Sequence, residues 1–168
     1  LGLGERVGLF GFGASAHIAI QVARHWGCEP YVFTRTSGNR RLAEELGAAW
    51  VGGPGDRPPR LLHRAVVFAP AGRLVAAALQ TLERGGVVSI ASITMDPIPA
   101  IDYRLLFEER ELRSTTAATR EDAAELLRLA GAIPIRARVE PFPLVEANRA
   151  LRLLKESKIR GAAALVMG

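Results

Sequence analysis

The chain has 168 residues, about the length of one domain, and 49% of them are apolar, so a folded protein with its own core is expected rather than a disordered one. No apolar run approaches the roughly 20 residues that cross a membrane, no signal peptide is evident, and the single cysteine excludes an internal disulfide, which together fit a cytoplasmic protein. The net charge is +5, but the sequence has no run of basic residues and few aromatic residues. This composition argues against a nucleic-acid-binding protein and favours one that binds an anionic small ligand.

Short apolar runs alternate with segments of helical spacing along most of the chain. We expect strands at 6–10, 30–34, 48–52, 65–69, 86–92 and 111–116, and helices at 14–26, 39–47, 72–83, 103–110 and 120–131. Thr119 is the expected N-cap of the last of these helices, with Glu121 and Asp122 in its first turn. The alternation predicts an α/β fold: a doubly wound, six-stranded parallel sheet of Rossmann type, in three layers.

The C-terminal part follows another pattern. It reads as a strand, an amphipathic helix and a strand, so we divide the chain into a main domain over residues 1–140 and a tail over residues 141–168. The sequence also opens directly into a strand, without an initiator Met, and we expect it to be a piece of a longer protein.

A glycine motif joins the first strand to the first helix. Gly11, Gly13 and Ala16 match the pattern G-x-G-x-x-G/A. Gly11 allows the sharp turn, Gly13 lets a pyrophosphate approach the backbone, and Ala16 is small enough for the helix to pack on the strand. Free N–H groups at the start of the helix attract the anion. The motif therefore predicts a nucleotide site, with a methyltransferase of similar topology as the main alternative.

The end of the second strand bears on which nucleotide binds. A cofactor with a free ribose 2′-OH usually meets Asp or Glu there, whereas this chain has Thr34 and Arg35, with Arg40 and Arg41 one helical turn further on. A hydroxyl and a guanidinium would bind a 2′-phosphate that a carboxylate would repel. We therefore expect NADP(H) in preference to NAD(H).

Other polar residues do not form a second site. His17 follows the glycine loop and could touch phosphate, but we expect it to be a solvated or packed helix residue. Asp96 and Asp102 lie in a proline-containing loop, where turn formation is the simpler role, and Ser15 lacks the spacing of a nucleophile. The three histidines are too scattered to suggest a metal site.

Five segments together resemble the C-terminal, cofactor-binding half of the medium-chain, zinc-dependent alcohol dehydrogenases. They include the "ELGA" after the second helix and the "PLVEAN" of the tail, and they are residues 4–35, 43–53, 65–72, 82–93 and 141–166. The resemblance implies that an N-terminal domain carrying the catalytic zinc is absent from this sequence, and that the tail packs against that domain. It implies no catalytic residue and no metal ligand in this chain.

By matching position, the resemblance also implies the residues that hold the cofactor. The pyrophosphate would lie against the glycine loop, formed by Gly11, Phe12, Gly13, Ala14, Ser15 and Ala16. The adenosine ribose and its phosphate would meet Thr34, Arg35, Thr36 and Arg40 at the second strand, and the channel from the adenine to the ribose would be lined by Ala69, Pro70 and Ala71 after the fourth strand. The nicotinamide would lie near Ser92 and Ile93 after the fifth strand, and Arg160 falls close to a pyrophosphate-binding arginine of some relatives.

These features lead to an NADP(H)-binding domain of a zinc-dependent alcohol dehydrogenase or aldehyde reductase, inactive on its own. Two alternatives stay open: the cofactor domain of a zinc-free quinone or enone oxidoreductase, and a non-catalytic nucleotide-sensing dimerisation domain. The strand at 111–116 should lie at the edge of the sheet, so we also expect a homodimer joined along that edge.

Overall fold

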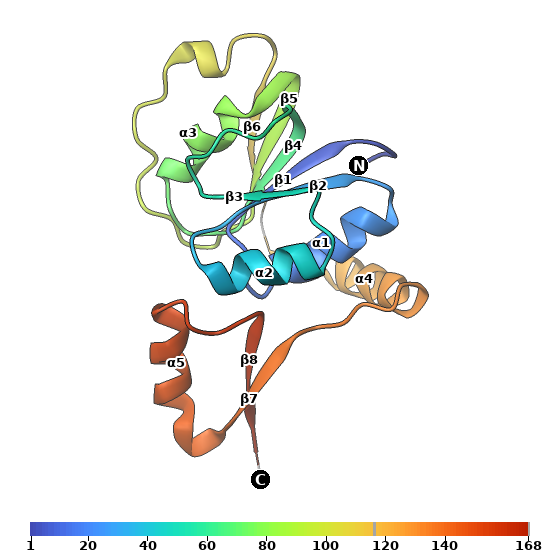
Figure 1. Ribbon diagram of the computed structural model, residues 1–168, viewed down its shortest axis with the longest axis vertical. Coiled ribbons are helices and arrows are strands. Elements are labelled where there is room, and N and C mark those ends of the chain that lie inside the picture. Colours follow the sequence, from blue (N-terminus) through green and yellow to red (C-terminus); the bar gives the residue numbers. More distant parts are fainter. Residues whose placement is uncertain (116, 168) are drawn as a thin grey trace.

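The main sheet of the computed structural model is six-stranded and parallel, in the order β3-β2-β1-β4-β5-β6 (Figure 1). The structure describes residues 1–115 and 117–167. The order reverses between β1 and β4, as in a doubly wound sheet, which confirms the predicted fold class. The strands are β1 (Arg6–Phe10), β2 (Glu29–Phe33), β3 (Trp50–Gly52), β4 (Leu62–Val67), β5 (Leu82–Ile90) and β6 (Glu111–Ser114).

Helices on both faces make the predicted three layers, because side chains alternate between the faces along each buried strand. Leu9 of β1 packs in a core with α1 (Ala16–His25) and α2 (Ser37–Glu45). Phe10 belongs to the core on the opposite face, where α3 (Arg73–Gln80) lies. There its ring stacks on Phe33 with centroids 4.0 Å apart. The first helix and the central strands therefore form a rigid base for the loop between β1 and α1.

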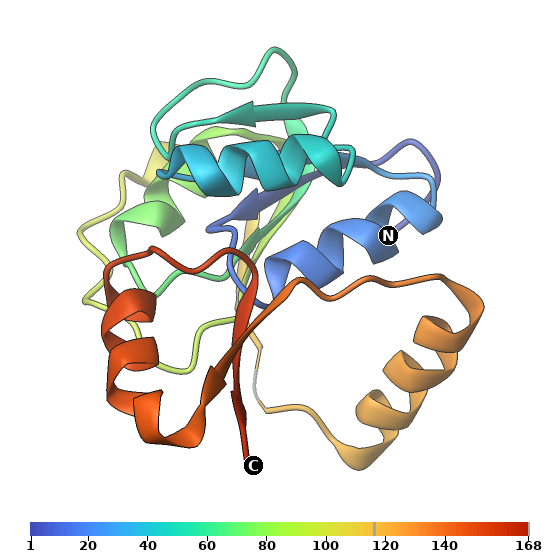
Figure 2. The ribbon, with the colours of Figure 1, turned by 60° about the horizontal axis from the view of Figure 1, so that its bottom comes forward.

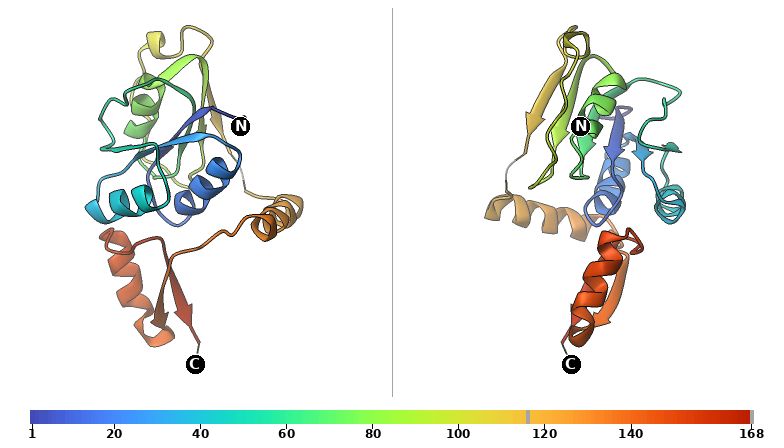
Figure 3. Two further views of the ribbon diagram at one scale, coloured as in Figure 1. Left: turned by 45° about the vertical axis from the view of Figure 1, so that its right-hand side comes forward. Right: turned by 90° about the vertical axis from the view of Figure 1, so that its left-hand side faces the viewer.

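The tail forms a second, two-stranded parallel sheet with one helix, as predicted. Figures 2 and 3 show these elements as a separate group beside the main sheet. Their small core contains Phe142, Ala150 and Ile159. The elements after the main sheet are α4 (Arg120–Ala132), β7 (Val139–Pro143), a 3₁₀ turn η2 (Leu144–Glu146), α5 (Ala147–Lys155) and β8 (Ala162–Val166). The division at residues 140 and 141 stays a prediction.

The predicted helix over 103–110 is wrong. Only a 3₁₀ turn, η1 (Tyr103–Leu105), forms there, and Asp102 caps it by accepting a hydrogen bond from the Arg104 N–H (2.9 Å). Glu108 and Glu109 have φ values of 71° and 62°, which are left-handed and end any right-handed helix.

Several other predicted boundaries also differ from the structure. β4 begins at Leu62, earlier than predicted, and β5 begins at Leu82, which pairs with it. Helix α3 therefore ends at Gln80. The last predicted residue of the edge strand, Thr116, lies outside the described residues. In the described part of the chain, no helix is long and apolar enough to cross a membrane.

Candidate functional site

The loop between β1 and α1 needs glycine at its first position. Gly11 has φ +91°, and its N–H donates to the carbonyl of Phe33 (2.9 Å). A Cβ placed on Gly11 would lie 2.8 Å from the Cβ of Ala69 and 2.9 Å from its backbone nitrogen. The turn therefore brings β1 against the end of β4 with no room for a side chain.

Gly13 is different, because a Cβ on it would meet no atom within 4 Å. Folding therefore does not require that residue 13 lack a Cβ. No acceptor among the described residues takes the N–H groups of Gly13, Ala14 and Ser15. These donors precede the first turn of α1, and Ser15 makes no side-chain cap. The loop is thus an open cradle of free N–H groups at a helix N-terminus, the arrangement that binds a phosphate.

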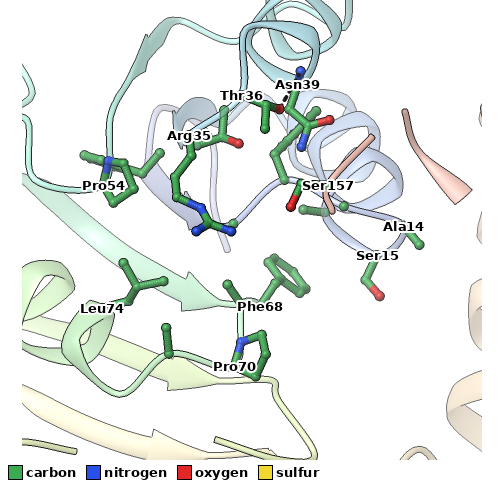
Figure 4. Close-up of a pocket in the computed structure, with 18 of the residues that line it drawn as sticks. Ala14, Ser15, Arg35, Thr36, Asn39, Pro54, Phe68, Pro70, Leu74 and Ser157 are labelled. Carbon is green, nitrogen blue, oxygen red and sulfur yellow. Dashed lines mark hydrogen bonds between the residues drawn. The ribbon is translucent and has the colours of Figure 1, made fainter. Parts of the chain in front are cut away.

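This loop forms one wall of a cavity of about 510 Å³ at the carboxyl ends of β1, β2 and β4 (Figure 4). The position is the crevice in which doubly wound sheets bind ligands. The lining from the main sheet and its connections is Gly11, Phe12, Gly13, Ala14, Ser15, Ala16, Phe33, Thr34, Arg35, Thr36, Asn39, Pro54, Phe68, Ala69, Pro70, Ala71, Arg73, Leu74 and Asp96, and the tail adds Leu154, Ser157, Ile159 and Gly161.

The end of β2 supplies the polar side of the cavity. Thr34 is buried, and its carbonyl accepts a hydrogen bond from the Nε of Arg40 (3.3 Å). Thr36 caps α2 by accepting from the N–H of Asn39 (3.3 Å). The side chain of Arg35 extends into the cavity (Figure 4). The lining contains two arginines and a single carboxylate, Asp96, so the cavity favours an anion.

The structure brings most of the sequence-predicted site residues together and leaves three outside the cavity. The glycine loop, residues 34–36 and residues 69–71 all line it. Arg40 holds the backbone of Thr34 instead. Ser92 donates to the carbonyl of Thr94 (2.7 Å), and Ile93 is fully exposed.

Arg160 lies near the first turn of α2 and is not among the residues that line the cavity. A Cβ on Gly38 would be 3.1 Å from the Arg160 Nε. The backbone N–H of Arg160 donates to the Oε1 of Glu140 on β7 (2.8 Å).

Sequence reasoning missed part of the lining. Asn39 and Arg73 lie in the first turns of α2 and α3, and their place just after two strands was a signal that could have found them. Leu154, Ser157 and Ile159 could not be found in this way. They come from the tail, and only the folded chain places them opposite the glycine loop.

The described residues do not offer a set of ligands that could hold a zinc ion. In the described residues, no group of three or more His, Cys, Asp or Glu side chains could hold a metal ion. Cys28 is buried away from the cavity, where burial, with the nearby Glu5 carboxylate, raises the pKa of its thiol and disfavours the thiolate that binds metals.

Comparison with known proteins points to one family. The family model described as zinc-binding dehydrogenase matches residues 16–132. The chain is 46% identical over 165 residues to the probable alcohol dehydrogenase AdhA of Mycobacterium tuberculosis, a match that covers 98% of this chain and 48% of that protein. The chain thus spans about half the length of this curated relative.

Solved structures share the fold. The alcohol dehydrogenase of Aeropyrum pernix superposes with a TM-score of 0.88 at 23% identity, over 99% of this chain and 51% of that one. The acetophenone reductase of Geotrichum candidum, solved in complex with NAD, superposes with a TM-score of 0.86 at 18% identity, over 96% of this chain and 48% of that one. At these identities the likeness is one of fold.

Proposed function

The chain belongs to the zinc-binding dehydrogenase family, and we propose that it is the NADP(H)-binding domain of a zinc-dependent alcohol dehydrogenase or aldehyde reductase. The family and the match to one half of a longer relative support a cofactor-binding role. In the complete enzyme, hydride would pass between the cofactor and an alcohol or carbonyl compound. This chain would not turn over substrate alone, since its described residues offer no metal site.

The preference for NADP(H) rests on one observation. Arg35 points into the cavity at the end of β2, where a carboxylate would bind a free ribose 2′-OH. The fold by itself does not select the cofactor, because the reductase with NAD has the same fold. A guanidinium at this place would pair with a 2′-phosphate, and Thr36 and Asn39 lie beside it.

The other residues of the cavity have roles in binding and orientation. The N–H groups of Gly13, Ala14 and Ser15 would hold the pyrophosphate, and the open space over Gly13 admits it. Pro70 and the neighbouring alanines would line the channel that leads from the adenosine. The bound cofactor supplies the hydride chemistry, and this chain holds its adenosine and pyrophosphate end in place.

The test compares two small fragments of the cofactors, 2′,5′-ADP and 5′-AMP, by calorimetric titration of the chain. We expect tighter binding of 2′,5′-ADP, and a loss of that preference in Arg35→Asp. Arg41→Asp makes the same charge change at an exposed residue outside the lining, and it should keep most of the preference. Equal binding of the two fragments by the unaltered chain would contradict the proposed NADP(H) preference.

A further inference from the structure

The ring of His17 is buried and uses both of its nitrogens. His17 is the second residue of α1 and only 1% exposed. Its Nε2 accepts a hydrogen bond from the backbone N–H of Arg138 (3.1 Å), in the segment that leads into β7. An acceptor at Nε2 places the ring proton of the neutral imidazole on Nδ1, which lies 3.2 Å from the carbonyl of Gly13. One side chain therefore joins the glycine loop to the start of the tail.

Gln21 binds the same segment one helical turn further along α1. Its Oε1 accepts from the N–H of Arg136 (2.9 Å), and its Nε2 donates to the carbonyl of Arg136 (3.1 Å). The Nε2 also donates to the carbonyl of His17 (2.8 Å), so both polar ends of the amide are engaged. Beside them, the guanidinium of Arg138 pairs with Glu45 of α2 (3.3 Å), where both side chains are exposed.

These contacts are concentrated on a very short stretch. Among the described residues, every hydrogen bond and ion pair between the part before α4 and the part after it ends on Arg136 or Arg138. The tail beyond them supplies Leu154, Ser157 and Ile159 to the lining of the cavity. The hydrogen bonds from α1 to segment 136–138 therefore connect the part of the chain that carries the glycine loop to the part that carries these three residues.

We propose that His17 and Gln21 are positioning residues that hold segment 136–138 on α1 and so set the cofactor cavity between the glycine loop and the tail. The proposal rests on the proposed function for its ligand. Neither side chain needs to touch the cofactor. His17 connects the two parts, because the Gly13 carbonyl that its Nδ1–H faces belongs to the glycine loop and the Arg138 N–H belongs to the segment that leads into β7.

Three substitutions of His17 separate its polar role from its bulk. His17→Phe keeps a ring and loses both nitrogens. His17→Gln places its amide about where Nε2 lies, whereas the shorter side chain of His17→Asn places its amide only about where Nδ1 lies. The first measurement is amide hydrogen exchange at Arg138. Loss of this acceptor should speed exchange by roughly fivefold or more in the Phe and Asn variants, and the Gln variant should restore slow exchange.

The second measurement is the NADPH dissociation constant of each variant. It should rise by roughly fivefold in the Phe and Asn variants and return close to the original value in the Gln variant, since one hydrogen bond is lost or kept. Two-bond nitrogen–proton correlation spectra of the unaltered chain should show the neutral ring with its proton on Nδ1. A ring protonated on Nε2 would overturn the proposal.

A purely structural role gives a different result. If His17 only fills space, the Phe variant should keep slow exchange at Arg138 and full affinity for NADPH, which would overturn the proposal. Should the Phe variant fail to fold, Gln21→Leu tests the same segment through exchange at Arg136. If the unaltered chain binds no NADPH while the exchange pattern is as expected, the proposed function fails and the positioning of the segment stands.

Discussion

Gly11 and Gly13 lie two residues apart in the same loop and are required for different reasons. Gly11 has a left-handed backbone and no room for a Cβ beside Ala69, so its requirement belongs to the fold. Gly13 has neither constraint. We propose that a bound pyrophosphate approaches the backbone through the open space over Gly13, so that this glycine serves the ligand rather than the fold. The sequence motif contains both glycines without distinguishing their roles, whereas the structure shows that only Gly11 lacks room for a side chain.

For Gly13→Val we expect an intact fold and a dinucleotide affinity that falls about tenfold or more, because the added side chain occupies the space the phosphate needs. Thermal unfolding and calorimetric titration with NADPH measure the two effects. Gly131→Val is the matched control, because a Cβ there also meets no atom within 4 Å and Gly131 lies on α4, outside the cavity. A Gly13→Val variant that binds as before would contradict the assignment of the loop.

Gly11→Ala should instead lower the free energy of unfolding by about 1–3 kcal/mol, since the new Cβ meets Ala69 and alanine is strained at positive φ. Urea denaturation measures the change. Unaltered stability would show that the turn can relax, and the close approach of β1 and β4 would then not explain this glycine.

Arg6 is a buried charge at the opposite end of β1. Its guanidinium pairs with Glu83, and its Nε donates to the carbonyl of Leu61 (2.5 Å). The Arg6 side chain is 8% exposed and that of Glu83 is 39% exposed. Glu83→Gln should destabilise the chain by about 1–2 kcal/mol, because it leaves a charge without its counterion, and partial exposure keeps the cost below that of a fully buried pair.

A surface pair provides the control for Glu83. The Nη1 of Arg60 lies 3.3 Å from the Oε2 of Glu29, and both side chains are more than 40% exposed. Glu29→Gln should change the free energy of unfolding by less than about 0.5 kcal/mol. Equal effects of the two substitutions in urea denaturation would contradict the role of the Arg6–Glu83 pair.

At the scale of elements, α4 depends on its own cap. Thr119 and Asp122 form a capping box, in which the Thr119 hydroxyl accepts from the Asp122 N–H (3.1 Å) and the Asp122 carboxylate accepts from the Thr119 N–H (2.7 Å). None of the helix's residues is buried, and Leu126 and Leu127 are exposed. Few packing contacts would therefore hold the helix in place if the cap were lost.

Acid should therefore fray α4 before the main sheet unfolds. The hydrogen bonds from the Thr119 hydroxyl and backbone N–H lower the pKa of Asp122 in the folded chain. A lowered pKa means that this stabilisation is present above the unfolded pKa of about 4 and is lost as the pH falls through the folded value. Amide exchange in the first turn of α4 should quicken over that range, and Asp122→Asn should remove the pH dependence. The same pH dependence in Asp122→Asn would contradict the assignment.

The pattern of the sequence predicted the buried elements better than the exposed ones. Strand β1 has the predicted bounds, and each of its residues is buried. Segment 103–110 has apolar residues at helical spacing, but Glu108 and Glu109 adopt a left-handed backbone conformation that the spacing does not encode. The glycine loop was found because its residues are adjacent in sequence. The tail wall of the cavity and the contacts of His17 were not, because they join residues more than 100 positions apart.

At the scale of the whole molecule, β6 lies at the free edge of the main sheet, and we propose a two-fold dimer formed along it. Thr115 donates to the carbonyl of Ile90 (2.8 Å), so the preceding N–H, that of Ser114, points away from β5 at the free edge. Light scattering should give twice the chain mass of 18.1 kDa, and Ser114→Pro should give a folded monomer. A monomeric unaltered chain would contradict the proposal.

The tail leaves apolar surface uncovered. Val145 is 94% exposed, and Leu151 on α5 is 62% exposed. We propose that residues 141–168 pack against a catalytic domain in the complete enzyme, and that the main domain ends near residue 140. The exposure of these side chains supports that arrangement, because a surface of this kind is normally covered by a partner.

Calorimetric titration of the unaltered chain with NADPH and with NADH, side by side in low-phosphate buffer, tests dinucleotide binding directly. We expect both cofactors to bind at one site per chain and NADPH to bind more tightly, since Arg35 lies in the cavity and no carboxylate ends β2. Equal affinities would contradict the selection of the 2′-phosphate. No binding of either cofactor would contradict the central claim that this chain holds a dinucleotide.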